Sequence, residues 1–126
     1  MAARCPTILG HIDLVTKFNE SAAFFNETAP RYRAAALEAL HAADPERTLL
    51  EINTGAVSRG YRSAPYPAQF LLRAWRERGG EIILTADSHQ TGTVVWGYRQ
   101  AADWARAAGY TRCMILTASG RAACPL

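Results

Sequence analysis

The stretch Glu81-Ile82-Ile83-Leu84-Thr85-Ala86-Asp87-Ser88-His89 indicates a buried strand that ends at an Asp-x-His pair. The apolar run 82–84 follows Gly79-Gly80 and precedes polar residues, which is typical of a parallel strand covered on both faces. Side chains two residues apart on an extended strand point the same way, roughly 6–7 Å apart along the backbone. Ligands of α/β proteins bind at the carboxyl ends of parallel strands. We therefore expect Asp87 and His89 to share a site, where a carboxylate and an imidazole could hold a divalent ion.

Length and composition predict one ordinary globular domain. The chain has 126 residues, of which 49% are hydrophobic and 20% charged. No apolar run approaches the roughly 20 residues that cross a bilayer, and no signal-type core follows Met1, so we expect a cytoplasmic protein with no membrane partner. Cys5, Cys113 and Cys124 lack C-x-x-C spacing, which favours reduced thiols over disulfides or a zinc knuckle. The net charge of +3 comes from scattered arginines, which favours solvated helix faces over a nucleic-acid surface.

Strands and helices are expected to alternate around this central strand. Alternation of this kind indicates right-handed βαβ units and a parallel sheet, hence the α/β class. Pro65-Tyr66-Pro67 is expected to open the second helix, and Thr93 to cap the third. The other expected strands span 7–11, 48–53 and 112–117. The expected helices span 30–43, 65–78 and 94–108, with a long ordered loop at 14–29 and a short tail at 118–126.

Three of the predicted strands end in polar pairs on what should be one edge of the sheet. These pairs are His11 with Asp13, Glu51 with Asn53, and Asp87 with His89. One such pair is weak evidence, because an aspartate often caps a loop beside a hydrogen-bonded histidine. Two His/Asp pairs make a metal site as favoured as a structural role, and these ligands suit zinc, manganese or iron. Glu51 has a second interpretation, as a buried group that supports the ligands.

Basic residues lie in the loops beside these strand ends, namely Lys17, Arg59 and Arg62. A solvated loop charge is the plain alternative for each of them. The segment 58–62, which contains Gly60, favours a binding role, because the planar fork of arginine matches a phosphate group with two hydrogen bonds. A cation beside a metal cluster would bind a phosphate ester and neutralise the charge that develops in the transition state.

Several motifs, in this order, resemble the later motifs of the PHP family of metal-dependent phosphoesterases, and within it those of the histidinol-phosphatases. The motifs are Ile8-Leu9-Gly10-His11-Ile12-Asp13-Leu14-Val15-Thr16-Lys17-Phe18, Leu50-Glu51-Ile52-Asn53-Thr54-Gly55, Pro65-Tyr66-Pro67, and Thr85-Ala86-Asp87-Ser88-His89. The resemblance implies a distorted seven-stranded βα barrel, similar to a TIM barrel. Residues 1–126 would form a single partial domain, about the C-terminal half of that barrel.

The resemblance also implies the chemistry. Up to three divalent ions would serve hydrolysis of L-histidinol phosphate to L-histidinol and phosphate in histidine biosynthesis, with a metal-bridging hydroxide attacking phosphorus in line. By matching motif, the resemblance implies three metal ligands, His11, Asp87 and His89, of which Asp87 and His89 are also catalytic. It implies phosphate binding by Lys17, Arg59 and Arg62. The supporting residues would be Asp13, Glu51 and Asn53.

The family's N-terminal half, with its His-x-His pair and further ligands, has no counterpart in this sequence. We therefore expect an incomplete metal cluster, weak metal binding and little turnover by this chain alone, with the missing half or a second copy as partner. Two other readings remain open. One is a non-catalytic fragment or assembly module that associates through an open sheet edge. The other is a PHP phosphoesterase that acts on a different phosphate ester.

Overall fold

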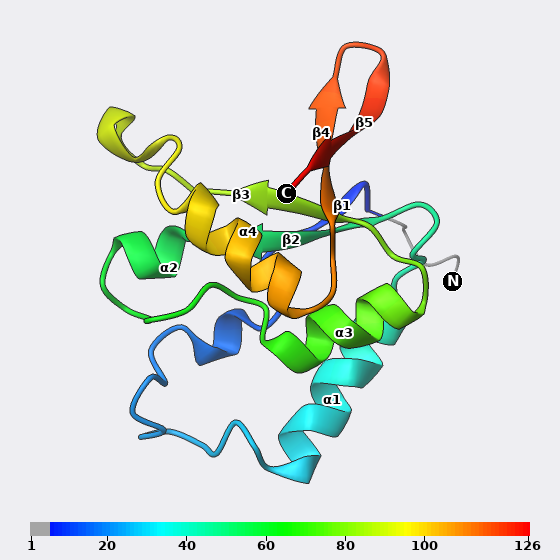
Figure 1. Ribbon diagram of the computed structural model, residues 1–126. Helices are drawn as coiled ribbons and strands as arrows, with labels where there is room; N and C mark the ends of the chain where they lie inside the picture. Colours follow the sequence, from blue (N-terminus) through cyan, green and yellow to red (C-terminus); the bar gives the residue numbers. More distant parts are fainter. Residues whose placement is uncertain (1–5) are drawn as a thin grey trace.

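A single five-stranded sheet organises the structure, a computed structural model that describes residues 6–126 (Figure 1). The sheet order is β1-β2-β3-β4-β5, with the first four strands parallel and the last antiparallel to its neighbour. The expected α/β class is confirmed, and the expected parallel sheet is found for the first four strands but not for β5; the partial barrel stays a prediction. The strands are β1 (Ile8–Leu9), β2 (Leu49–Asn53), β3 (Ile82–Thr85), β4 (Arg112–Thr117) and β5 (Gly120–Pro125).

Three helices of nine or more residues cover the sheet: α1 (Pro30–His41), α3 (Gln69–Glu77) and α4 (Tyr98–Ala107). The short helix α2 (Gly55–Ser58) and the 3-10 turns Leu14–Thr16 and Thr91–Thr93 lie in the connections. Figure 1 shows α2 and the segment after β3 together, at the end to which β2 and β3 point. No helix within residues 6–126 combines the length and the apolar character that a bilayer crossing requires.

The core forms where β2 meets the helices. All five residues of β2 are buried, as expected for a central parallel strand with both faces covered. On α3, Leu71, Leu72 and Trp75 are fully buried, because they recur at helical spacing on one face. The central strand and its helices therefore give the carboxyl ends of the sheet a rigid base.

The short tail expected at 118–126 is instead a strand, β5, which forms a tight hairpin with β4. The Thr117 hydroxyl donates a hydrogen bond of 2.9 Å to the Gly120 carbonyl, and Gly120 adopts a φ of 121° that favours glycine. The small residues of β5 lack the β-branched and aromatic signature of a strand, which hid this element from the sequence pattern. Cys113 and Cys124, on these two strands, are free thiols as expected, while Cys5 lies outside the described residues.

Two expected helix starts were also wrong. The third helix begins at Tyr98, because Gly97 at φ 75° breaks the chain between the 3-10 turn Thr91–Thr93 and α4. Thr93 therefore does not cap α4, contrary to expectation, and Gly97 precedes the helix instead. The second helix begins at Gln69, since Tyr66 is extended and exchanges backbone hydrogen bonds of 2.9 and 3.3 Å with Asn53.

Candidate active site

The connections after β1 and β3 bend sharply at the carboxyl edge of the sheet. His11, Asp13 and Asp87 have φ values of 55°, 74° and 47°, in a region that residues other than glycine rarely adopt. Each such conformation costs on the order of 1 kcal/mol or more and is often found at functional sites. Because β3 ends at Thr85, Asp87 and His89 are not neighbours on one face of an extended strand, as the sequence pattern predicted.

The bends surround a cavity of about 390 Å³. Segments far apart in the sequence line it, and five of the predicted site residues are among them. The lining residues are His11, Leu14, Lys17, Arg59, Tyr61, Tyr66, Asp87 and His89. Two permanent cations and one carboxylate face this space, together with two imidazoles and two phenols. The cavity therefore suits a small anion.

An ion pair between Arg59 and Asp87 forms one wall of the cavity. Arg59 Nη2 lies 2.9 Å from Asp87 Oδ2, Arg59 Nη1 donates to the Asp87 carbonyl at 3.1 Å, and each side chain is 27% exposed. Gly55 packs against the pair, since a Cβ there would lie 2.8 Å from both Arg59 Nη2 and Asp87 Cβ. The absent side chain at position 55 thus lets the guanidinium and the carboxylate meet.

His89 is held by the same carbonyl. Its Nδ1 lies 2.8 Å from the Asp87 carbonyl oxygen and 3.2 Å from Arg59 Nη1. A carbonyl only accepts and a guanidinium only donates, so the two contacts require opposite tautomers; the shorter one, to the carbonyl, favours the proton on Nδ1. His89 Nε2 then keeps its lone pair for a ligand or a proton.

Glu51 joins the ends of three strands beneath the cavity. Its carboxylate accepts hydrogen bonds from the His11 backbone N–H at 2.7 Å, the Thr85 hydroxyl at 2.7 Å and the Asn53 side-chain amide at 3.1 Å. Asn53 in turn accepts a hydrogen bond of 2.8 Å from the Gly55 N–H. Neither Glu51 nor Asn53 lines the cavity. The structure thus places both where they position other residues.

Asp13 is not among the lining residues of the cavity and connects the first loop to two helices. Its carboxylate accepts hydrogen bonds from the Tyr32 hydroxyl of α1 and, at 3.1 Å, from the Ala68 N–H before α3. Burial raises the pKa of the Asp13 carboxyl above its usual range. Asp13 therefore supports the position of the first loop and contributes no side chain to the cavity.

Arg62 was expected beside Arg59 at a phosphate, but the structure places it outside the cavity. Its guanidinium lies 2.8 Å from Glu27 and 3.2 Å from Glu20, and it donates to the Thr16 carbonyl at 2.8 Å. Two carboxylates in the loop 14–29 therefore hold this arginine. Lys17, on the same loop, does reach the cavity, with Nζ 5.2 Å from the centre of the Tyr61 ring.

The predicted metal ligands share the cavity without forming a metal site of their own. Within residues 6–126, no three His, Cys, Asp or Glu side chains come together in a way that could hold a metal ion. Asp87, moreover, is already paired with Arg59. The donors among residues 6–126 do not fit the cluster that the resemblance implies. Binding of zinc, manganese or iron stays a prediction, and it would need donors from elsewhere.

Sequence reasoning missed Tyr61, Tyr66 and Leu14 as lining residues. Tyr66 was assigned to the start of a helix, and only its backbone pairing with Asn53 brings it to the site. For Tyr61 the sequence did hold a signal, since it follows Gly60 in the same segment, 58–62, that contains Arg59.

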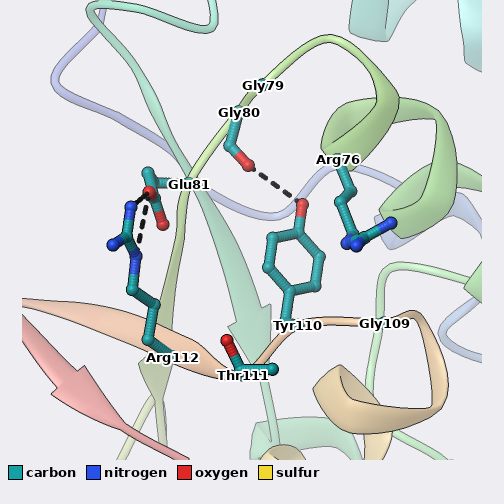
Figure 2. A pocket seen from close by; sticks show the side chains of 8 residues that line it. All are labelled: Arg76, Gly79, Gly80, Glu81, Gly109, Tyr110, Thr111 and Arg112. Atoms are coloured by element: carbon teal, nitrogen blue, oxygen red, sulfur yellow. Dashed lines mark hydrogen bonds and ion pairs between the residues drawn. The ribbon is translucent and has the colours of Figure 1, made fainter.

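A larger cavity, of about 490 Å³, opens at the opposite end of the strands. Figure 2 shows its residues at the start of β3 and β4, where Arg112 pairs with Glu81 and the Tyr110 hydroxyl donates to the Gly80 carbonyl at 3.1 Å. Ligand sites of parallel α/β sheets lie at carboxyl ends, so this cavity at the amino ends is the weaker candidate.

Comparison with known proteins points to phosphatases. No family model matches the chain. It is 30% identical to a probable histidinol-phosphatase of Schizosaccharomyces pombe over 87% of this chain and 36% of that protein. It is 37% identical to one of Deinococcus radiodurans over 74% of this chain and 32% of that protein. An N-succinylarginine dihydrolase of Sphingopyxis alaskensis is 32% identical over 72% of this chain and 22% of that protein.

The chain spans about a third of the length of the two histidinol-phosphatase relatives. Both similarities cover most of this chain. The two relatives therefore suggest a phosphatase role, and with it a hydrolase.

Proposed function

We propose that this chain forms the phosphate-binding part of a phosphomonoesterase of the histidinol-phosphatase kind, with L-histidinol phosphate as substrate. The observation that carries the proposal is that Lys17 and Arg59 line one cavity with Asp87 and His89 at the carboxyl edge of the sheet. The similarity to two probable histidinol-phosphatases supports the choice of substrate class. The sheet would then belong to a larger βα barrel, completed by a segment that corresponds to the rest of those relatives.

In this proposal the basic residues bind the phosphoryl group and stabilise its charge. Arg59 keeps free N–H groups beyond those used at Asp87, so it can donate to phosphoryl oxygens while Asp87 fixes its plane. Lys17 adds a second positive charge from another loop. Donors fixed in advance are worth more in a transition state than donors that must reorganise, and phosphoryl transfer depends mainly on such positioning.

His89 would manage a proton in the same reaction. Its Nε2 could accept a proton from the water that attacks phosphorus, while the ester oxygen leaves with the bonding electron pair and takes a proton from solvent water to give the alcohol. The imidazole would be held in place by its Nδ1 contact with the Asp87 carbonyl.

The test measures phosphate binding and phosphate release separately. Calorimetric titration of the purified chain with inorganic phosphate should show binding, and Arg59→Gln should weaken it roughly 10- to 100-fold, as expected for lost charged hydrogen bonds. Release of phosphate from L-histidinol phosphate should be slight for the chain alone. It should rise when the chain is co-purified with the part of the D. radiodurans relative that has no counterpart here.

The control for this experiment is Arg76→Gln, in the cavity at the amino ends of the strands, which should leave both measurements unchanged. A substrate panel that includes N-succinylarginine covers the third relative. Absence of phosphate binding, or equal effects of the two substitutions, would contradict the proposal.

A further inference from the structure

Tyr66 carries a buried hydroxyl with no hydrogen-bond partner. The residue is 3% exposed, its side chain forms part of the cavity wall, and its oxygen contacts no donor or acceptor within the described part of the chain. Other enclosed tyrosines differ: the Tyr110 hydroxyl donates to the Gly80 carbonyl at 3.1 Å, and the Tyr32 hydroxyl donates to Asp13. A buried polar group without a partner costs free energy of folding, so the position of Tyr66 needs an explanation.

The backbone holds Tyr66 firmly beside the charged groups of the site. Its N–H and C=O both pair with Asn53, the last residue of the buried strand β2, at 3.3 and 2.9 Å. Burial, followed by the negative charge of Asp87, raises the pKa of the Tyr66 hydroxyl above its usual range. The group is therefore a fixed, neutral donor at neutral pH.

We propose that Tyr66 is a ligand-binding residue of this cavity, and that its hydroxyl donates a hydrogen bond to a phosphoryl oxygen of the phosphate monoester held by Lys17 and Arg59. The inference rests on the proposed function and adds a donor to it. The hydroxyl oxygen is shielded from solvent, so a phosphoryl oxygen that reaches it has no bound water to displace. Because this oxygen is enclosed, binding would require a side chain of the cavity wall to move.

The experiment replaces single hydroxyls by hydrogen in the full chain. Tyr66→Phe keeps the ring that forms the wall and removes only the unpaired donor. Tyr110→Phe is the matched control, because it removes a buried hydroxyl whose hydrogen bonds lie far from the phosphate cavity. For each variant, the affinity for inorganic phosphate is measured by calorimetry, and stability by thermal and urea unfolding.

The two variants should change opposite properties. Tyr66→Phe should weaken phosphate binding roughly tenfold with the Tm unchanged or raised, since an unsatisfied group has been removed. Tyr110→Phe should lower the Tm and leave the affinity unchanged. Unchanged affinity in Tyr66→Phe, or a Tm as low as that of Tyr110→Phe, overturns the inference.

The Arg59→Gln variant separates this inference from the proposed function. If Arg59→Gln weakens phosphate binding and Tyr66→Phe does not, the role of Tyr66 is wrong while the phosphate site stands. If the unmodified chain binds no phosphate, both fall.

Discussion

At the scale of single residues, the cavity depends on a close contact that only glycine permits. Arg59 and Asp87 come from different connections, and Gly55 is the position that lets them meet. The sequence indicated Arg59, Asp87 and His89 as site residues through their place after predicted strands. The sequence did not indicate the ion pair between Arg59 and Asp87, because a contact between side chains 28 residues apart produces no periodic pattern in the sequence.

The first prediction concerns Gly55→Ala. A Cβ at this position would lie 2.8 Å from Arg59 Nη2 and 2.9 Å from Asp87 Oδ2, so the ion pair must move apart. We expect phosphate affinity to fall about as far as in Arg59→Gln, with a loss of stability of about 1–3 kcal/mol from overpacking. Calorimetry and urea unfolding measure the two effects.

Gly92→Ala is the control for this prediction, because nothing lies within 4 Å of a Cβ at Gly92. That variant should bind phosphate like the unmodified chain. Equal affinity in Gly55→Ala and Gly92→Ala would show that the contact at Gly55 does not shape the site.

At the scale of elements, the apolar patterns predicted β2, β3, β4 and the three main helices, because burial imposes a period that the sequence displays. The pattern could not predict β5, whose small residues pair only because the chain turns back at Gly120. Nor could it assign Arg62, since an arginine in a loop has the same sequence pattern whether it faces a phosphate or the carboxylate of Glu27.

The second prediction concerns the loop 14–29, which carries Lys17 to the cavity. Burial opposes ionisation of Glu27, but hydrogen bonds from Arg62 and Asn19 outweigh it and hold the pKa of Glu27 below its usual value of about 4.5. A lowered pKa means that the ionised carboxylate stabilises the fold at neutral pH, and that this contribution is lost as pH falls through the folded-state pKa.

Glu27→Gln should therefore lower stability by about 1–3 kcal/mol at pH 7, as expected for a hydrogen-bonded charge that is partly buried. Urea unfolding at a series of pH values should show the difference shrinking as the pH falls below 4.5. Asp103→Asn, which breaks an exposed pair with Arg106, should change little at any pH. A difference for Glu27→Gln that persists unchanged at low pH would contradict this account of the loop.

At the scale of the whole molecule, the sheet presents two unlike surfaces. Its carboxyl edge holds the basic cavity, whereas Ile115 and Leu116 of β4 are 45% and 52% exposed. The basic cavity agrees with the proposed binding of a phosphate ester. The exposed apolar side chains of β4 agree with the alternative of an assembly module that binds no phosphate ester. A ligand titration that reports on every backbone amide separates these two readings.

The most direct test is a nitrogen-proton NMR titration of the chain with L-histidinol phosphate. The account predicts saturable shifts of the amides of Lys17, Arg59, Asp87 and His89, with none at Arg76 or Arg112 in the other cavity. Shifts confined to Arg76 and Arg112, or no shifts at millimolar ligand, would contradict the assignment of a phosphate-ester site to the carboxyl edge of the sheet.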